Sequence, residues 1–169
     1  MPITIRSLQP EEWQLYREVR LAALLDSPEA FGSTYEGSRT YPEQRWIDLC
    51  HEPNWFAFDG PRPIGMVRAF QPDDKDLPEL VSMWVAPEYR GGDTATRLMR
   101  TMLDWARDNG EAGVHLRVTT TNERARRRYE RLGFVPNGIT EHLPDGRVEV
   151  EMEHRFSRET QSPPTPETR

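Results

Sequence analysis

The sequence predicts a mixed α/β protein in which helices pack against one central sheet. Segments rich in β-branched and aromatic residues alternate with segments whose apolar residues recur at helical spacing. The expected elements follow in the order β-α-α-β-β-β-α-β-α-β-β, which combines hairpins with strand–helix–strand crossovers. The chain has 169 residues, of which 36% are hydrophobic, and this supports one ordinary core.

Composition argues against several classes of function. The net charge is −6 and the pI about 5.3, whereas a general affinity for nucleic acid or anionic membranes needs a basic face. No apolar run approaches a membrane span, and the N-terminus lacks the apolar core of a signal peptide, so we expect a cytoplasmic protein. The single cysteine, Cys50, allows no intrachain disulfide and is expected to be a buried small apolar residue.

One folded domain is expected over residues 1–156, followed by a disordered tail over residues 157–169. The tail reads S-R-E-T-Q-S-P-P-T-P-E-T-R, with almost no apolar residue and several prolines. Such a segment cannot bury enough apolar surface to offset the entropy of ordering it.

The first half of the chain predicts a strand, two helices and a hairpin. The strand covers residues 3–6, the helices run over 10–26 and 42–51, and the segment between the helices is partly loop. The hairpin strands cover residues 55–58 and 64–70, and Gly65 indicates a bulge or a close approach of another backbone. A polar loop over residues 71–78 follows.

A strand, a glycine turn and a helix in the middle of the chain organise the prediction. Apolar residues fill most of positions 80–85, Pro87 ends the strand, and Gly91-Gly92 make the turn. The next helix ends near Asn109-Gly110. A glycine-rich turn before a helix gathers free backbone N–H groups at the positive end of the helix dipole. The sequence therefore predicts a phosphate site at this turn.

The last third predicts three strands and one helix. The strands cover residues 114–120, 134–142 and 148–156, and Asn122 is placed to cap the helix that Gly133 ends. A Rossmann fold is not indicated, because the chain lacks a second βαβ half and an acidic residue placed for a ribose.

Two blocks of the sequence resemble the GNAT (Gcn5-related) N-acetyltransferase superfamily. V-A-P-E-Y-R-G-G-D-T-A-T-R-L-M, residues 85–99, resembles the acetyl-CoA signature: Arg or Gln, two residues, Gly, one residue, then Gly or Ala. N-E-R-A-R-R-R-Y-E-R-L-G-F, residues 122–134, is similar to the block in which an Asn and a Tyr approach the thioester. The segment L-A-A-L-L-D-S-P-E-A-F-G-S-T resembles a common bacterial version of the substrate-side helices. The resemblance covers residues 3–156 and implies a mostly antiparallel sheet of about six or seven strands flanked by about four helices.

The resemblance implies acetyl-CoA as co-substrate. It assigns cofactor binding to Trp84, Val85, Arg90, Gly91, Gly92, Asp93, Thr94, Ala95, Thr96, Asn122, Arg124 and Tyr129. The backbone of Trp84 and Val85 is expected to pair with the pantetheine amides, as in strand addition. Arg124 or Arg128 is expected to contact the CoA phosphates, and a solvated helix face is the alternative for this arginine cluster.

Asp93 departs from the signature, because it stands where the central Gly is expected. Its carboxylate would repel a diphosphate by on the order of a kcal/mol or more, which corresponds to about a tenfold loss of affinity. Asp93 is also placed to cap the helix through a hydrogen bond to the N–H of Ala95 or Thr96. Capping would occupy N–H groups that a phosphate needs, while nearby arginines would offset the charge.

The implied reaction is direct acetyl transfer from acetyl-CoA to a primary amine of a small molecule or peptide. Tyr129 is the expected acid for the leaving thiolate, because a phenol pKa of about 10 lies close to the thiol pKa of about 8.5. A core tyrosine on the same helix face as Ala125 and Leu132 is the alternative.

Glu79 is the expected general base. Strand alternation places it on one face with Val81, Met83 and Val85, where apolar neighbours would raise the pKa of its carboxyl. The alternatives are a solvated acid at the start of the strand, with a water as the base, and Glu36 as a weaker candidate.

Other functions stay open at this stage. Asp93 favours a GNAT-fold protein that has lost catalysis and serves binding or regulation, whereas Arg90, Asn122 and Tyr129 together favour an enzyme. Transfer of a longer acyl group, or transfer to oxygen, is a third alternative. The four histidines lack metal-ligand spacing, so no metal is expected. A homodimer is possible, and the loops at residues 31–46, 71–78 and 137–147 are expected to select the acceptor.

Overall fold

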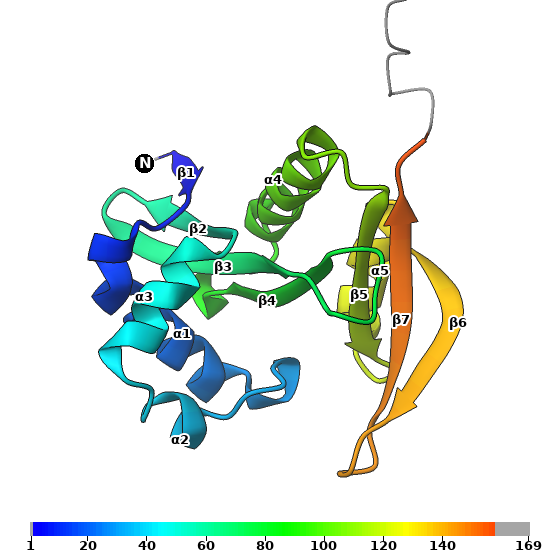
Figure 1. Cartoon of the computed structure of the whole chain (residues 1–169), viewed down its shortest axis with the longest axis horizontal. Helices are drawn as coiled ribbons and strands as arrows, with labels where there is room; N and C mark the ends of the chain where they lie inside the picture. Colours follow the sequence, from blue (N-terminus) through cyan, green and yellow to red (C-terminus); the bar gives the residue numbers. More distant parts are fainter. Residues whose placement is uncertain (1, 158–169) are drawn as a thin grey trace, which may run out of the picture.

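The structure, a computed structural model, describes residues 2–157 and confirms the predicted class. A seven-stranded sheet has the strand order β1-β2-β3-β4-β5-β7-β6 (Figure 1). Every neighbouring pair is antiparallel except β4 and β5, which are parallel. The predicted tail, apart from Ser157, lies outside the described residues.

The predicted strands are all present, with small changes at their ends. They are β1 (Ile3–Arg6), β2 (Asn54–Asp59), β3 (Arg62–Phe70), β4 (Glu79–Val85), β5 (Gly113–Thr119), β6 (Val135–His142) and β7 (Val148–Arg155). The α-helices of the described residues are α1 (Trp13–Asp26), α2 (Tyr35–Ser38), α3 (Glu43–His51), α4 (Thr94–Asp108) and α5 (Glu123–Arg131). Residues Pro10–Glu12 form a 3-10 turn before α1, and α2 is a single turn in the segment expected to be partly loop.

Helices cover both faces of the first four strands. In Figure 1, α4 lies on one side of the β2–β4 region, and α1 to α3 lie on the other side. The buried side of α4 carries the apolar residues that the helical period predicted: Leu98, Met99, Met102, Leu103 and Ala106. A Cβ on Gly65 would meet the Trp84 carbonyl oxygen at 3.0 Å and Leu98 at 3.1 Å, so the close approach predicted at this glycine is confirmed.

The first helices bury their predicted faces against this core. Trp46 and Cys50 of α3 are buried, as is Trp55 of β2, and the expectation that Cys50 is a buried small apolar residue is confirmed. Burial raises the pKa of the Cys50 thiol to about 11, which keeps the thiol protonated and unreactive at neutral pH. No helix within residues 2–157 combines the length and apolar character that a membrane crossing requires.

A bulge in β4 changes which residues share a face. The register with β3 shifts between the pairs Met66–Trp84 and Arg68–Val81, and Ser82 has a positive φ of 57°. The extra residue places Trp84, rather than Val85, on the face of Glu79 and Val81. The prediction that strict alternation puts Val85 on the face of Glu79 is therefore wrong.

The sheet opens between its two parallel strands. The register pairs β4 with β5 at Glu79 and His115, at the start of β4. In Figure 1 the strands β3 and β4 run across the view, while β5, β7 and β6 run up and down it. After Glu79, the residues of β4 therefore do not pair with residues of β5.

Candidate active site

The turn before α4 presents a row of unpaired backbone donors. Within residues 2–157, the N–H groups from Gly91 through Thr96 donate no hydrogen bond to another residue, and the first bonded amide is that of Arg97, which donates to Asp93 at 2.9 Å. Gly91 has a φ of +89°, a left-handed conformation that favours glycine. These donors lie at the positive end of a fifteen-residue helix, so the turn can bind an anion.

Asp93 does not occupy these donors. It stands at the N-cap position of α4, but its exposed side chain makes no capping hydrogen bond, so the predicted cap is wrong. Its ψ is 1°, whereas a capping residue normally has extended backbone that directs its side chain toward the second and third amides of the helix. The carboxylate adds negative charge near the site, yet the amides stay free.

Arg90 is held away from the turn. Its guanidinium forms an ion pair with Asp26 at the end of α1, and its Nε donates to the Val85 carbonyl at 2.9 Å. Asp26 also accepts from the Trp84 indole at 3.0 Å. The Trp84 hydrogen bond, with those of Ser27 and Arg90, lowers the pKa of Asp26 to about 2. Arg90 thus connects the turn to α1, and its expected part in cofactor binding stays a prediction.

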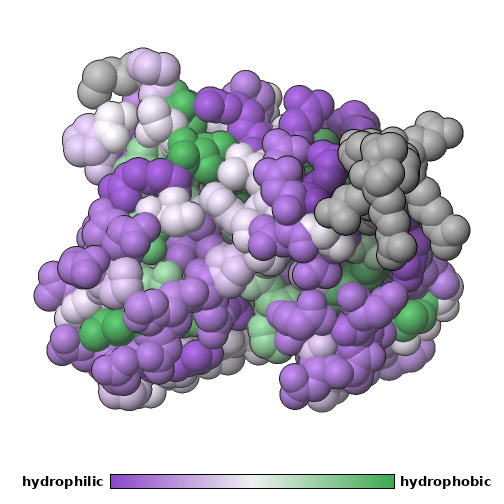
Figure 2. Space-filling view, turned by 45° about the horizontal axis from the view of Figure 1, so that its top comes forward, coloured by the Kyte–Doolittle hydropathy of each residue, from purple (hydrophilic) through white to green (hydrophobic). Residues whose placement is uncertain are grey.

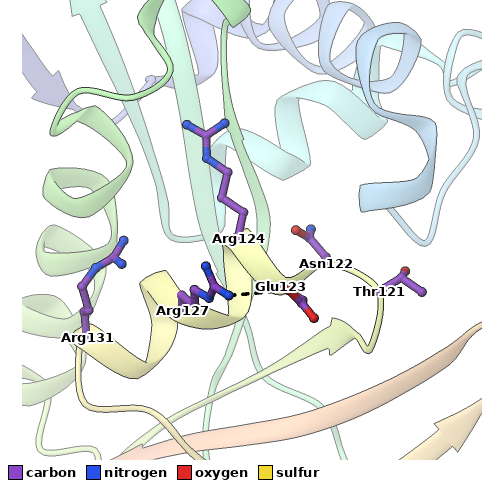
Figure 3. Close-up of a pocket in the computed structure, with 6 residues that line it drawn as sticks. All are labelled: Thr121, Asn122, Glu123, Arg124, Arg127 and Arg131. Atoms are coloured by element: carbon purple, nitrogen blue, oxygen red, sulfur yellow. Dashed lines mark ion pairs between the residues drawn. The ribbon is translucent and has the colours of Figure 1, made fainter.

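The start of α5 forms the opposite wall of the site. A cavity of about 670 Å³ is lined by Thr121, Asn122, Glu123, Arg124, Arg127 and Arg131 (Figure 3). Asn122 caps α5 as predicted, because its Oδ1 accepts from the Ala125 amide at 3.2 Å. The guanidinium of Arg124 lies 4.0 Å from the position that a Cβ on Gly91 would take. The fold therefore brings Arg124 to the glycine turn.

The edge of β4 lies between these two walls. Trp84 and Val85 are buried, and the carbonyl of Val85 is occupied by Arg90. Arg20 of α1 donates a hydrogen bond to the Ser82 hydroxyl at 2.5 Å, and this contact stabilises the bulge in β4. Burial lowers the pKa of Arg20 to about 10, and its guanidinium stacks on the Phe31 ring at 4.6 Å.

Tyr129 lies on the buried side of α5. Its ring packs edge-on against Phe134 with centroids 6.1 Å apart, which is the core contact of the alternative interpretation. Its hydroxyl nevertheless has no hydrogen-bond partner among residues 2–157. Burial raises the pKa of Tyr129, so the phenol keeps its proton at neutral pH and remains a donor.

Glu79 has polar neighbours, in contrast to the predicted apolar surroundings. Its side chain is 4% exposed and accepts from Arg117 Nε at 2.8 Å, while His115 Nε2 lies 3.9 Å away. Alternation along β4 could not reveal these neighbours, because both come from β5. Glu79 lines a second cavity, of about 340 Å³, which is separate from the one that Asn122 and Arg124 line.

The last two points concern Glu36, which lies outside both cavities, and the question of a metal site. Glu36 is exposed and pairs with Arg39 at 3.0 Å. Within residues 2–157, no group of three or more His, Cys, Asp or Glu side chains is arranged to hold a metal ion. The sequence analysis missed Asp26, Arg20 and Arg117, because each contacts a partner that is far away in the chain. Only their charge on otherwise apolar elements could have indicated that they have such partners.

The fold and the free amides of the glycine turn define a class, the mixed α/β proteins that can bind an anion at a helix N-terminus beside an open sheet. The profile of the acetyltransferase (GNAT) family matches residues 15–134. The chain belongs to this family.

Relatives and solved structures agree with this assignment. An uncharacterised N-acetyltransferase of Mycobacterium tuberculosis is 38% identical over 77 residues, which are 46% of this chain and 49% of that protein. N-acetyltransferase 8F1 of Rattus norvegicus is 32% identical over 93 residues, or 53% of this chain and 42% of that protein. This chain therefore spans about half the length of the curated relatives it matches.

Two crystal structures share the fold at low identity. The PaiA N-acetyltransferase from Thermoplasma acidophilum, in complex with coenzyme A, has a TM-score of 0.72 and 18% identity, covering 92% of this chain and 100% of its own. A GNAT-family acetyltransferase from Streptococcus pneumoniae has a TM-score of 0.76 and 16% identity over the same shares.

Proposed function

We propose that this protein transfers an acetyl group from acetyl-CoA to a primary amine of a small molecule or peptide. The observation that carries the proposal is the row of free N–H groups from Gly91 to Thr96 at the start of α4, with Arg124 beside it. Such donors suit a diphosphate, and the cavity beyond them is lined by three arginines and one glutamate. The relatives named as N-acetyltransferases, and the neighbour that holds coenzyme A, support the same cofactor.

The chemistry forms one bond and breaks another. The amine nitrogen attacks the thioester carbonyl, the carbon–sulfur bond breaks, and the amine loses the proton that the thiolate gains. Tyr129 supplies the proton to the sulfur, because its hydroxyl is protonated and has no hydrogen-bond partner among the described residues.

Glu79, or a water that it orders, removes the proton from the amine. Its carboxylate accepts a hydrogen bond from Arg117 Nε at 2.8 Å, which fixes the position of the carboxylate in the wall of the second cavity. The backbone of Trp84 and Val85 lines the site along the side of β4 that faces the gap to β5, where the pantetheine amides would pair.

The first test is acetyl-CoA binding by calorimetry at two salt concentrations. Micromolar affinity that weakens with salt is expected, since phosphate contacts are electrostatic. A panel of amines is then screened by release of the CoA thiol, with the acetylated product identified by mass. Lack of binding up to millimolar acetyl-CoA would overturn the proposal and favour a binding or regulatory role for the fold.

A further inference from the structure

We infer that the cavity around Glu79 selects acceptors that carry a second positive charge, such as α,ω-diamines. This inference rests on the proposed acetyl transfer and names the class of its acceptor. The observations that carry it are the charge of the cavity, a buried histidine in its wall whose ring makes no hydrogen bond within residues 2–157, and two exposed apolar residues in its lining.

The cavity has an excess of carboxylates. Its lining residues are Phe70, Pro72, Asp74, Lys75, Glu79, His115, Arg117, Ile139, Glu141, Glu149 and Glu151. Five of these are acids and two are Lys or Arg, whereas the cavity at the start of α5 has three arginines and one glutamate. The two cavities thus have opposite charge, which suits an anionic cofactor in one and a cationic acceptor in the other.

The internal ion pairs do not balance this charge. Arg117 is shared by three carboxylates: its Nε lies 2.8 Å from Glu79, and its Nη1 lies 2.7 Å from Glu141 and 3.9 Å from Glu149. Lys75 lies 3.3 Å from Glu151. One guanidinium cannot neutralise three carboxylates, so a ligand ammonium would find acceptors whose charge is only partly compensated.

His115 adds an unsatisfied polar group to the same wall. It is 3% exposed, and its ring makes no hydrogen bond to any of residues 2–157. Its Nε2 lies 3.9 Å from Glu79 and 3.8 Å from Glu151, too far for hydrogen bonds. A buried polar group normally has a partner, so its position in the cavity wall indicates a missing polar ligand.

Two exposed apolar residues also line the cavity. Phe70 is 45% exposed and Ile139 is 48% exposed, and both are among the few large hydrophobic residues of the described chain left open to solvent. Apolar side chains beside carboxylates suit an alkyl chain that ends in an ammonium group. The lining also includes residues of two segments expected to select the acceptor, the loop at residues 71–78 and the segment 137–147.

The test compares two acceptors of equal length. We expect kcat/KM for cadaverine to exceed that for pentylamine by about tenfold or more at low salt, because one ammonium is placed among uncompensated carboxylates. In Glu149→Gln and Glu141→Gln the ratio of kcat/KM for cadaverine to that for pentylamine should fall severalfold. Asp108→Asn, which removes one charge at the far end of α4, should leave the ratio unchanged.

The outcomes separate the inference from the proposed function. Equal turnover of cadaverine and pentylamine would overturn the inference alone, as would a preference for aminocaproate, which ends in a carboxylate. A ratio that Glu149→Gln and Glu141→Gln leave unchanged would also overturn it. Lack of turnover with every amine, despite bound acetyl-CoA, would overturn the proposed function instead. Thermal unfolding of each variant checks that it is folded, and the exposed position of Glu141 makes its substitution the safer of the two.

Discussion

Replacing Asp93 by Asn should tighten acetyl-CoA binding. The substitution keeps the size of the side chain, and it removes no hydrogen bond because the Asp93 side chain does not cap α4. The six amides from Gly91 to Thr96 stay in place, so the change isolates the effect of one negative charge near the phosphates.

The magnitude follows from the exposure of Asp93. A carboxylate about 6 Å from a phosphate charge is repelled by about 1 to 3 kcal/mol, depending on whether the effective dielectric is that of water or of a protein surface. Because Asp93 is exposed, the lower part of this range applies, which corresponds to about tenfold in Kd. Screening should reduce the gain at high salt, where the Debye length falls to about 3 Å at 1 M.

Calorimetric titration of the wild type and the variant at low and high salt measures this gain. Asp108→Asn is the matched control, because it removes the same charge from the other end of α4, about 20 Å away. The Asp93→Asn variant loses the favourable interaction of the carboxylate with the dipole of α4, so its free energy of unfolding should be lower by about 0.3–1 kcal/mol. An unchanged or weaker affinity at low salt would refute the reasoning and show that Asp93 helps to build the site.

Three further predictions concern the same site. Tyr129→Phe should lower kcat at least about tenfold with an unchanged melting temperature, because the lost hydroxyl has no hydrogen-bond partner within residues 2–157; unchanged turnover would remove Tyr129 from the mechanism. Gly91→Ala should destabilise the protein by about 1–2 kcal/mol in denaturant titrations, since its φ is +89°, whereas Gly92→Ala should cost clearly less, and equal costs would contradict the backbone argument. Asp26 has a folded pKa of about 2, below its unfolded value, so the hydrogen bonds that it accepts from Trp84, Ser27 and Arg90 contribute stability above about pH 4 that is lost as the pH falls toward 2; the stability difference between wild type and Asp26→Asn should shrink over this interval, and a constant difference would exclude the linkage.

Much of the fold could be predicted from local patterns. The helical period over residues 94–108 and the strand-like segments around it gave the correct elements, and Asn122 caps α5 as expected. Gly91 and the start of α4 form the predicted turn with free amides. These features depend on residues within one or two turns of the chain, so the sequence carries them directly.

The partners of the charged residues could not be predicted. Arg90 was expected at the phosphates but pairs with Asp26, 64 positions earlier, and Glu79 was expected among apolar residues but pairs with Arg117, 38 positions later. The bulge at Ser82 also moved Val85 to the face of β4 opposite Glu79. Local patterns cannot report such contacts, because they arise only when distant segments pack together.

The sequence by itself determined the order of elements, the glycine turn and the family resemblance, since periodicity, turn chemistry and motif spacing are properties of contiguous residues. The tertiary structure alone decided the shape and charge of the two cavities. It brought Arg124 of α5 to the turn before α4, and it gathered carboxylates from three strands and a loop in the cavity that Arg117 also lines. Electrostatic fields add over neighbours in space, and only the folded sheet defines which charges are neighbours.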